Sequence, residues 1–315
     1  YEAKRLGIKR GLALHEARRM CPQLIVLPSD YETYSMMSKR MFEILRRWTP
    51  LVEESSIDEG FADLTGMRRF HGCSYEQMGR DLQRTIHAEL GLTVSVGISL
   101  SKGLAKLCSK YRKPNGFTAV PGRYLHLFLQ RHKLDDVWGF GANTTAFLEK
   151  HGLRTAYDFV MKPERWVAAQ LTKVQVEIWH ELRGRSVYPV TTEEKTDYDT
   201  VSKCKSFTAP SANPDYIWAK LVRNLESAFI KLRRHRLKAR LLLVGLRFND
   251  FRHVGAEALL TRATAAPGEA VPVLRELRNR VFQPGAEYRA TMVCLGKLSA
   301  DRCDQLDLFE DRLRV

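Results

Sequence analysis

Residues 53–61 read Glu-Glu-Ser-Ser-Ile-Asp-Glu-Gly-Phe, and this stretch decides how the rest of the chain is interpreted. Extended runs at 51–54 and 57–64 are close enough to form a hairpin. In a regular strand, Asp58 and Glu59 would point to opposite faces and could not share an ion. At the end of a tight hairpin, the twist can bring both carboxylates toward one site, where Mg²⁺ takes a few protein oxygens together with substrate phosphates. Two adjacent acids are usually solvated surface, so the surrounding motifs must decide.

The first 120 residues alternate between helical and extended patterns. Apolar residues recur at helical spacing over 31–48 and 76–90, and a third helix is predicted after Ser101. Extended runs are predicted at 93–99 and 117–120, separated by a Lys-Pro-Asn-Gly turn. This part of the chain is therefore predicted to be an α+β unit.

The remaining chain divides into a helical segment, a linker and a second α+β unit. Residues 121–186 are predicted to be all-helical, and the polar stretch 187–198 has no periodicity and is predicted to be a linker. Beyond it, strands are predicted at 200–208, 239–248, 257–263 and 288–295, and helices at 214–236 and 272–282. The β-α-β-β-α-β order predicts an antiparallel four-stranded sheet with both helices on one face.

Composition narrows the class of partner. The 315 residues carry 51 Lys plus Arg against 36 Asp plus Glu, a net charge of +15, which favours a polyanion. Nowhere do 18 consecutive apolar residues occur, so we expect no membrane span. The six cysteines form no CxxC pair, which favours reduced thiols in a cytoplasmic protein. The first residues, YEAKR, lack an initiator Met, and we expect the natural N-terminus to lie upstream.

Three blocks of sequence carry a family resemblance that covers essentially the whole chain. Residues 56–64 (SIDEGFADL) resemble the S-[IL]-D-E-[AG]-[FY] hairpin of the Y-family, or lesion-bypass, DNA polymerases. Residues 1–8 (YEAKRLGI) are similar to that family's Y-E-A-R/K fingers motif. Residues 96–106 followed by KPNG at 113–116 resemble its palm segment, and the three blocks occur in the family's order and spacing.

The resemblance implies an α+β right-hand polymerase with a βαββαβ little-finger domain. Its expected parts are partial fingers at 1–30, palm at 31–120, thumb with a helix-hairpin-helix at 121–186, linker at 187–198, little finger at 199–298 and a C-terminal tail at 299–315. It also implies a monomer that binds primer-template DNA, a deoxynucleoside triphosphate and two Mg²⁺ ions.

Roles for the site residues follow from the same resemblance. Asp58 matches the ligand shared by both Mg²⁺ ions, and Glu59 matches the ligand nearer the primer 3′ end. Tyr1, Lys4 and Lys113 match positions that hold the triphosphate. A cation and a phenol hydroxyl suit a polyphosphate, although the family often has Arg where Lys4 stands, and Lys lacks the bidentate fork.

One departure from the family concerns its first strand. Members begin with a strand that carries another metal-binding Asp and a bulky residue that excludes ribonucleotides, and neither precedes Tyr1. We therefore expect the 315-residue chain to bind DNA but to polymerise poorly.

Two further groups of residues are expected to contact DNA phosphates. Gly139, Gly141 and Thr144 lie in a G-x-G turn that opens a helix, as in the family's thumb. Residues 231–240 hold six Lys or Arg, and they resemble the part of the little finger that follows the template-primer. From this run we expect contacts by Arg234, Arg236, Lys238 and Arg240.

The tail contains a partner motif. Residues 305–309 (QLDLF) resemble the motif with which bacterial polymerases bind the sliding clamp. Gln305 would enter a polar pocket of the clamp, while Leu306, Leu308 and Phe309 supply its apolar contacts.

The expected function is template-directed DNA synthesis past lesions, with transfer of deoxynucleotides to a primer 3′-hydroxyl by a two-metal mechanism. The alternative is a catalytically inactive relative that binds DNA and the clamp as an adaptor. A helix-hairpin-helix nuclease would require a further acidic cluster near Gly139, which the sequence does not supply.

Overall fold

The computed structural model describes residues 1–193 and 198–301. The chain forms two compact units, Tyr1–Glu193 and Glu194–Val315, which are described separately. Within the described ranges, no helix is long and apolar enough to cross a membrane.

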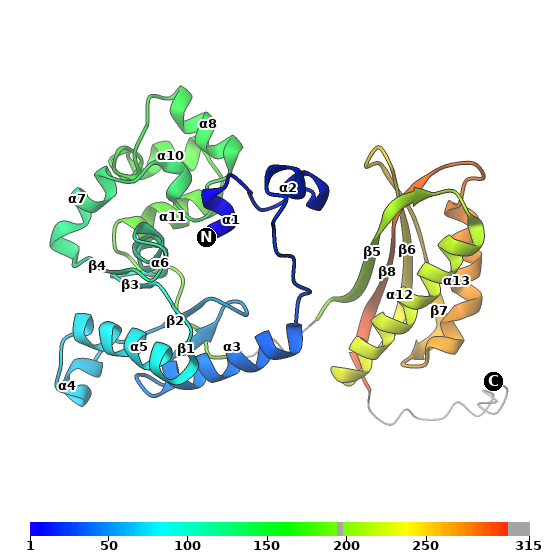
Figure 1. Ribbon diagram of the computed structural model, residues 1–315, viewed down its shortest axis with the longest axis horizontal. Coiled ribbons are helices and arrows are strands. Elements are labelled where there is room, and N and C mark those ends of the chain that lie inside the picture. Colours follow the sequence, from blue (N-terminus) through cyan, green and yellow to red (C-terminus); the bar gives the residue numbers. More distant parts are fainter. Residues whose placement is uncertain (194–197, 302–315) are drawn as a thin grey trace. The chain divides into compact units, whose positions relative to one another are not determined.

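The first part of unit 1 is the predicted α+β arrangement (Figure 1). Its elements, in chain order, are α1 (Glu2–Arg5), α2 (Leu14–Met20), α3 (Tyr31–Arg46), β1 (Val52–Glu54), β2 (Gly60–Ala62), α4 (Met67–His71), α5 (Tyr75–Leu90), β3 (Val96–Ile98), α6 (Lys102–Tyr111) and β4 (Phe117–Ala119). The three predicted helices are confirmed, but each strand is shorter than its extended pattern, and the sequence did not predict α1, α2 or α4.

Local signals explain where these helices begin and end. The Ser74 hydroxyl accepts the N–H of Gln77 at the start of α5, and Gly91 ends that helix with a φ of 66°. The Ser101 hydroxyl caps α6 by accepting the N–H of Leu104.

Strands β3 and β4 form a parallel pair that α6 connects. Gly97 lets α6 cross β3 at backbone contact, because a Cβ at this position would lie 2.1 Å from the carbonyl oxygen of Ala105. On α5, a Cβ at Gly79 would lie 2.5 Å from Cδ1 of Ile98. Gly97 in the sheet and Gly79 on the helix packed against it are therefore both required by close packing.

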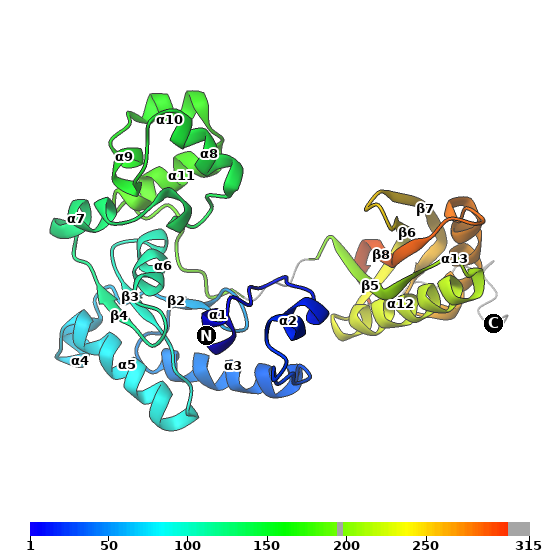
Figure 2. The same ribbon diagram turned by 45° about the horizontal axis from the view of Figure 1, so that its top comes forward.

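Residues 122–182 are helical, as predicted (Figure 2). The elements are η1 (Gly122–Tyr124), α7 (Leu125–Gln130), η2 (Leu134–Asp136), α8 (Ala142–Lys150), α9 (Ala156–Val160), α10 (Glu164–Gln170) and α11 (Lys173–Leu182). Leu104, Leu107 and Cys108 of α6 are buried in the same hydrophobic cluster as these helices. Helix α6 therefore belongs to the sheet and to the helical segment at once.

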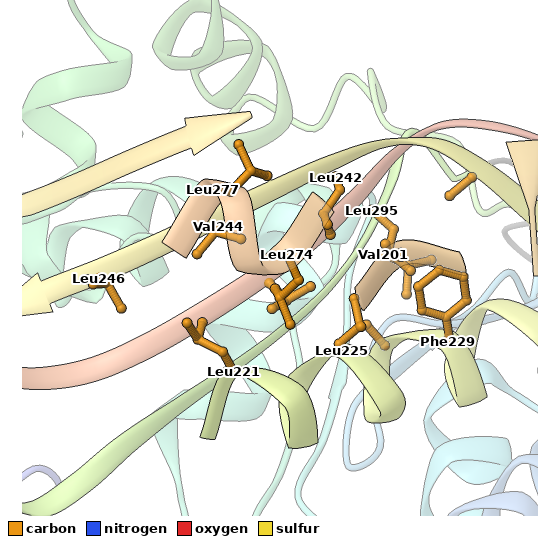
Figure 3. Close-up of a cluster of buried hydrophobic side chains, with 14 of the residues drawn as sticks. Val201, Leu221, Leu225, Phe229, Leu242, Val244, Leu246, Leu274, Leu277 and Leu295 are labelled. Atoms are coloured by element: carbon orange, nitrogen blue, oxygen red, sulfur yellow. The ribbon is translucent and has the colours of Figure 1, made fainter. Parts of the chain in front are cut away.

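Unit 2 is the predicted antiparallel sheet covered on one face by two helices (Figure 1). Its elements are β5 (Thr200–Ser211), α12 (Pro214–Arg234), β6 (Leu237–Phe248), β7 (His253–Thr264), α13 (Pro267–Val281) and β8 (Tyr288–Ala300), with strand order β5-β8-β6-β7. Leu221, Leu225 and Phe229 of α12 meet Leu242 and Val244 of β6 in its core (Figure 3).

Several predicted boundaries in unit 2 were wrong, most of all the start of α13 and the end of β8. Helix α13 begins at Pro267 rather than at Pro272, because Pro267 occupies its first turn, where no N–H partner is needed, and Pro272 lies inside the helix. Strand β8 continues to Ala300, since Ser299 and Ala300 pair with Lys238 and Leu237 of β6. The predicted tail boundary at residue 299 therefore falls inside a strand.

Candidate active site and DNA-binding surfaces

The central feature of unit 1 is the hairpin formed by β1 and β2. Val52 pairs with Ala62, and Glu54 pairs with Gly60, which leaves a five-residue connection at 55–59. The Ser56 N–H donates to the Glu59 carbonyl across this connection, at 2.9 Å. The predicted hairpin is confirmed, but Asp58 and Glu59 lie in its turn rather than in its second strand, so they are freed from the alternation of a strand.

The two carboxylates of this turn have different partners. Asp58 is exposed, and its Oδ1 accepts a 2.8 Å hydrogen bond from the Ser56 hydroxyl. Glu59 Oε2 accepts from the Lys106 ammonium on α6 at 2.7 Å. The turn is therefore held both by its own serine and by α6, while the Asp58 carboxylate stays accessible.

A second lysine of α6 binds β1 one turn away. The Lys102 ammonium lies 2.7 and 2.6 Å from the two carboxylate oxygens of Glu53, and both side chains are less than one-fifth exposed. Burial opposes ionisation of Glu53, but hydrogen bonds from Lys102 and Thr191 outweigh it and hold the pKa of this carboxyl below its usual value.

Aromatic rings adjoin these ion pairs. The Trp138 ring lies 6.2 Å from the Phe61 ring of β2 and 6.4 Å from the Tyr188 ring. The Lys106 ammonium lies 4.9 Å from the Trp138 centroid, and Lys102 lies 5.0 Å from that of Phe61. The glycine-rich turn after η2 thus brings Trp138 beside the carboxylate hairpin. The two aromatic rings add cation–π attraction to the ion pairs of Lys102 and Lys106.

The predicted triphosphate residues lie in two other places. Tyr1 and Lys4 are exposed neighbours at α1, with the Lys4 ammonium 5.5 Å from the Tyr1 centroid. Lys113 is exposed in the turn between α6 and β4. Over the described ranges, no hydrogen bond or ion pair joins any of the three to Asp58 or Glu59, so these side chains are available to a ligand.

The predicted phosphate site at α8 has the expected backbone. Gly139 has a φ of 91°, and Gly141 is the N-cap of α8, with no side chain that accepts the first N–H groups of the helix. Thr144 lies in the first turn of this nine-residue helix. The free amides and the positive end of the helix dipole suit a phosphate.

In unit 2, the predicted DNA-binding residues of the basic run differ in solvent exposure. Arg234, Arg236 and Arg240 are exposed. The Lys238 ammonium instead lies 3.1 Å from Asp301 and is 13% exposed, so its charge is partly neutralised. Arg236 has a φ of 54° at the corner between α12 and β6.

Sequence reasoning assigned no role to several residues that the structure brings to these sites. They are Glu53, Lys102, Lys106 and Trp138 in unit 1, and Lys297 in unit 2. The spacing of Lys102 and Lys106, four residues apart on a predicted helix, is the signal that could have placed them on one face. The clamp-binding residues Gln305, Leu306, Leu308 and Phe309 lie outside the described residues.

The donor set at the hairpin fits Mg²⁺ in part. Two adjacent carboxylates in an accessible turn are the kind of protein ligand that Mg²⁺ takes, the other positions being filled by water and phosphates. Asp58 has a free carboxylate oxygen, whereas Glu59 must share its charge with Lys106. Over the described residues, no cluster of three or more His, Cys, Asp or Glu side chains is arranged to hold a metal.

Adjacent acids in an accessible hairpin turn and exposed lysines on separate loops are the kinds of group that a nucleotidyl transferase uses. Residues 1–110 match the impB/mucB/samB family, and residues 199–308 match the C-terminal domain of that family.

Curated relatives agree along most of the chain. DNA polymerase IV of Lactococcus lactis subsp. cremoris (strain SK11) is 30% identical over 251 residues, which are 80% of this chain and 68% of that protein. DNA polymerase IV of Clostridium kluyveri is 29% identical over 83% of this chain and 65% of its own length. DNA polymerase IV of Dehalococcoides mccartyi is 27% identical over 100% of this chain and 80% of its own length. The chain thus spans about two-thirds to four-fifths of the lengths of these relatives.

Solved structures share the fold. A Y-family DNA polymerase chimera of Dbh and Dpo4 superposes with a TM-score of 0.78 at 21% identity, covering 95% of this chain and 86% of the chimera. An insertion ternary complex of Dbh DNA polymerase gives a TM-score of 0.58 at 22% identity, with the same coverage of the two chains. The right-hand architecture with fingers, palm, thumb and little finger is confirmed.

The fold and the hairpin therefore define the class, a Y-family DNA polymerase. Within that class, the chain belongs to the impB/mucB/samB family, together with the bacterial DNA polymerases IV.

Proposed function

We propose that this chain is a template-directed DNA polymerase for translesion synthesis. The observation that carries the proposal is the β1–β2 hairpin, which presents Asp58 and Glu59 side by side in an accessible turn braced by α6. Both acids are present and exposed or half-exposed, which argues against an inactive adaptor.

In this proposal Asp58 and Glu59 are the carboxylates that hold two Mg²⁺ ions. When bound, the ions would supply charge neutralisation at the phosphates and activation of the primer 3′-hydroxyl. Lys106 orients Glu59 through their 2.7 Å ion pair, while Tyr1, Lys4 and Lys113 bind and orient the triphosphate of the incoming deoxynucleotide. The primer 3′-hydroxyl displaces pyrophosphate from the α-phosphate. Lys4 and Lys113 stabilise the negative charge of the triphosphate during this step.

The remaining proposed roles concern DNA and the cell. The α8 N-terminus, with Gly139, Gly141 and Thr144, and the exposed Arg234, Arg236 and Arg240 are proposed to bind phosphates of the primer-template without reading sequence. Lys238 contributes to the same basic surface beside Asp301. The protein is proposed to act as a cytoplasmic monomer.

Primer extension by the full-length protein tests the catalytic proposal. Asp58→Ala should lower Mg²⁺-dependent incorporation by at least about 100-fold, with the dissociation constant for primer-template DNA changed less than about twofold, because phosphate contacts dominate DNA affinity. Glu54→Gln is the matched control, since Glu54 lies in the same hairpin but pairs with Arg46 at the surface. Equal activity of Asp58→Ala and the wild type would refute the assignment.

Clamp binding is tested separately. Deletion of residues 305–309 should abolish stimulation of synthesis by the bacterial sliding clamp and leave basal DNA binding intact, because none of these residues is proposed to bind phosphate. A matched decrease of both activities would show that these residues serve the fold rather than the clamp.

A further inference from the structure

Glu181 is a buried carboxylate on α11, with 1% of its surface exposed. Its Oε2 accepts the N–H of Gly103 at 2.8 Å, in the first turn of α6. Its Oε1 accepts the N–H groups of Val187 and Tyr188 at 2.6 and 3.0 Å. Three backbone donors and the positive end of α6 compensate the burial of this charge.

Two further contacts fix α6 against Glu181. The Glu181 carbonyl accepts a 2.7 Å hydrogen bond from the Ser101 hydroxyl, which also caps α6. At Gly103 a Cβ would lie 3.2 Å from the Cβ of Glu181, so the two helices approach closely. The N-terminus of α6 is therefore held in place by one residue of α11.

Residues 187–191, called the strap below, continue from Glu181 to the β-hairpin. The Thr191 N–H and hydroxyl donate to Glu53 Oε2 at 2.9 and 3.2 Å. The Lys102 ammonium lies 3.3 Å from the Pro189 carbonyl while it binds Glu53. These residues were predicted to belong to a linker at 187–198, yet polar groups of Pro189 and Thr191 bind Lys102 and the hairpin strand β1.

Helix α6 links Glu181 to the β-hairpin. It carries Lys102, which binds Glu53, and Lys106, which binds Glu59 one turn later. A displacement of the α6 N-terminus would move both ammonium groups relative to the hairpin turn. Glu181 itself has no hydrogen bond to Asp58 or Glu59 within the described part of the chain.

We propose that Glu181, acting through α6 and the strap, positions the Asp58–Glu59 turn for nucleotidyl transfer. Glu181 is thus a positioning residue and not a catalytic one. The inference rests on the proposed polymerase function, and it joins the thumb helix α11 to the geometry of the palm hairpin.

The test compares single-turnover nucleotide incorporation in variants of the full-length protein, at a temperature where each is folded. Glu181→Ala should lower the maximal incorporation rate about 10- to 100-fold, the loss expected when catalytic groups are displaced by about 1 Å. The dissociation constants for DNA and for the nucleotide should change less than about twofold, because Glu181 contacts neither the α8 N-terminus nor the triphosphate residues. Glu181→Gln retains one acceptor oxygen, so its maximal incorporation rate should lie between those of the wild type and Glu181→Ala.

Controls isolate the network. Glu164→Gln removes an acid of the same helical segment whose 3.2 Å hydrogen bond to His180 lies outside the Glu181 network, and it should leave the incorporation rate unchanged. Thr191→Val removes one donor at the other end of the strap, an exposed 3.2 Å hydrogen bond, and should lower the rate about threefold, near the low end for the loss of one hydrogen bond. In the double variant of Glu181→Ala and Thr191→Val, the loss should be smaller than the product of the single losses, because both act on one network.

Several results would overturn the inference. An unchanged incorporation rate in Glu181→Ala, or a loss that parallels weaker DNA binding, would reduce Glu181 to a structural residue. Should Glu181→Ala fail to fold, wild-type rates in both Glu181→Gln and Thr191→Val would overturn it. Absence of Mg²⁺-dependent extension by the wild-type protein would instead refute the proposed function.

Discussion

At the scale of single residues, the hairpin site depends on a glycine as much as on its two acids. Asp58 and Glu59 lie in a turn that ends against α6 through Lys106. Helix α6 can lie at this depth because Gly97 of β3 has no side chain to separate the helix from the strand. The glycine in the V-G-I-S segment therefore has a physical role at the active site, although it carries no chemistry.

Substitution of Gly97 tests this packing. Gly97→Ala should destabilise unit 1 by at least about 3 kcal/mol, since its Cβ would meet backbone atoms that cannot move independently. Gly79→Ala should cost less, about 1–3 kcal/mol, because the new Cβ meets the ends of the Ile98 and Phe117 side chains, which can shift. Denaturant unfolding of the two variants gives the comparison. The reverse order would contradict close α6–β3 packing.

At the scale of elements, α6 organises the palm and the thumb. One of its faces is buried in the thumb cluster through Leu104, Leu107 and Cys108. Burial raises the pKa of the Cys108 thiol to about 12, which fits a packing role rather than a reactive one. Lys102 and Lys106 extend from the same helix to the hairpin strand and the hairpin turn.

The pair between Glu53 and Lys102 gives this arrangement a pH dependence. The pKa of Glu53 is lower in the folded chain than its usual 4.5, so its contribution to stability is present above that value and is lost as the pH falls through the folded pKa. Glu53→Gln should cost about 1–3 kcal/mol at pH 7, because it leaves the nearly buried Lys102 without its counter-ion. The difference from wild type should shrink below about pH 4.5.

Denaturant unfolding at pH 7, 5 and 3.5 measures this dependence. Glu54→Gln is the control, because the pair between Glu54 and Arg46 is about half exposed and should contribute little at any pH. A difference between Glu53→Gln and wild type that stayed constant down to pH 3.5 would contradict the role assigned to the ionised carboxyl.

The sequence predicted elements better than the contacts between them. Periodicity and caps placed α3, α5, α6 and α12 within a few residues, because those signals are local. The β-hairpin was predicted too, but the turn position of Asp58 and Glu59 depends on the register between β1 and β2. The links from Glu181 to α6, and from Thr191 to Glu53, join residues 78 and 138 positions apart, and no local pattern indicates such pairs.

At the scale of the whole molecule, each of the two units has its own hydrophobic core and its own basic residues. Unit 1 offers the α8 N-terminus, and unit 2 offers the arginines near the α12–β6 corner. Each unit therefore presents positive charge of its own, within a chain whose net charge is +15. Affinity for DNA should therefore be strongly salt-dependent and largely independent of base sequence.

Arg240 and Lys297 allow a sharp test of that expectation. Ala239 pairs with Leu298 and Leu241 with Gly296, so the exposed Arg240 and Lys297 lie at the same level of the adjacent strands β6 and β8. Like charges on neighbouring strands repel, and a bound phosphate would relieve that repulsion. Replacing either by Ala should weaken DNA binding equally for all sequences and reduce the slope of log K against log salt by about one. Arg275→Ala on α13, whose guanidinium covers Trp218, is the control and should leave the slope unchanged. An unaltered slope in both the Arg240 and the Lys297 variants would show that these two cations do not contact the backbone of DNA.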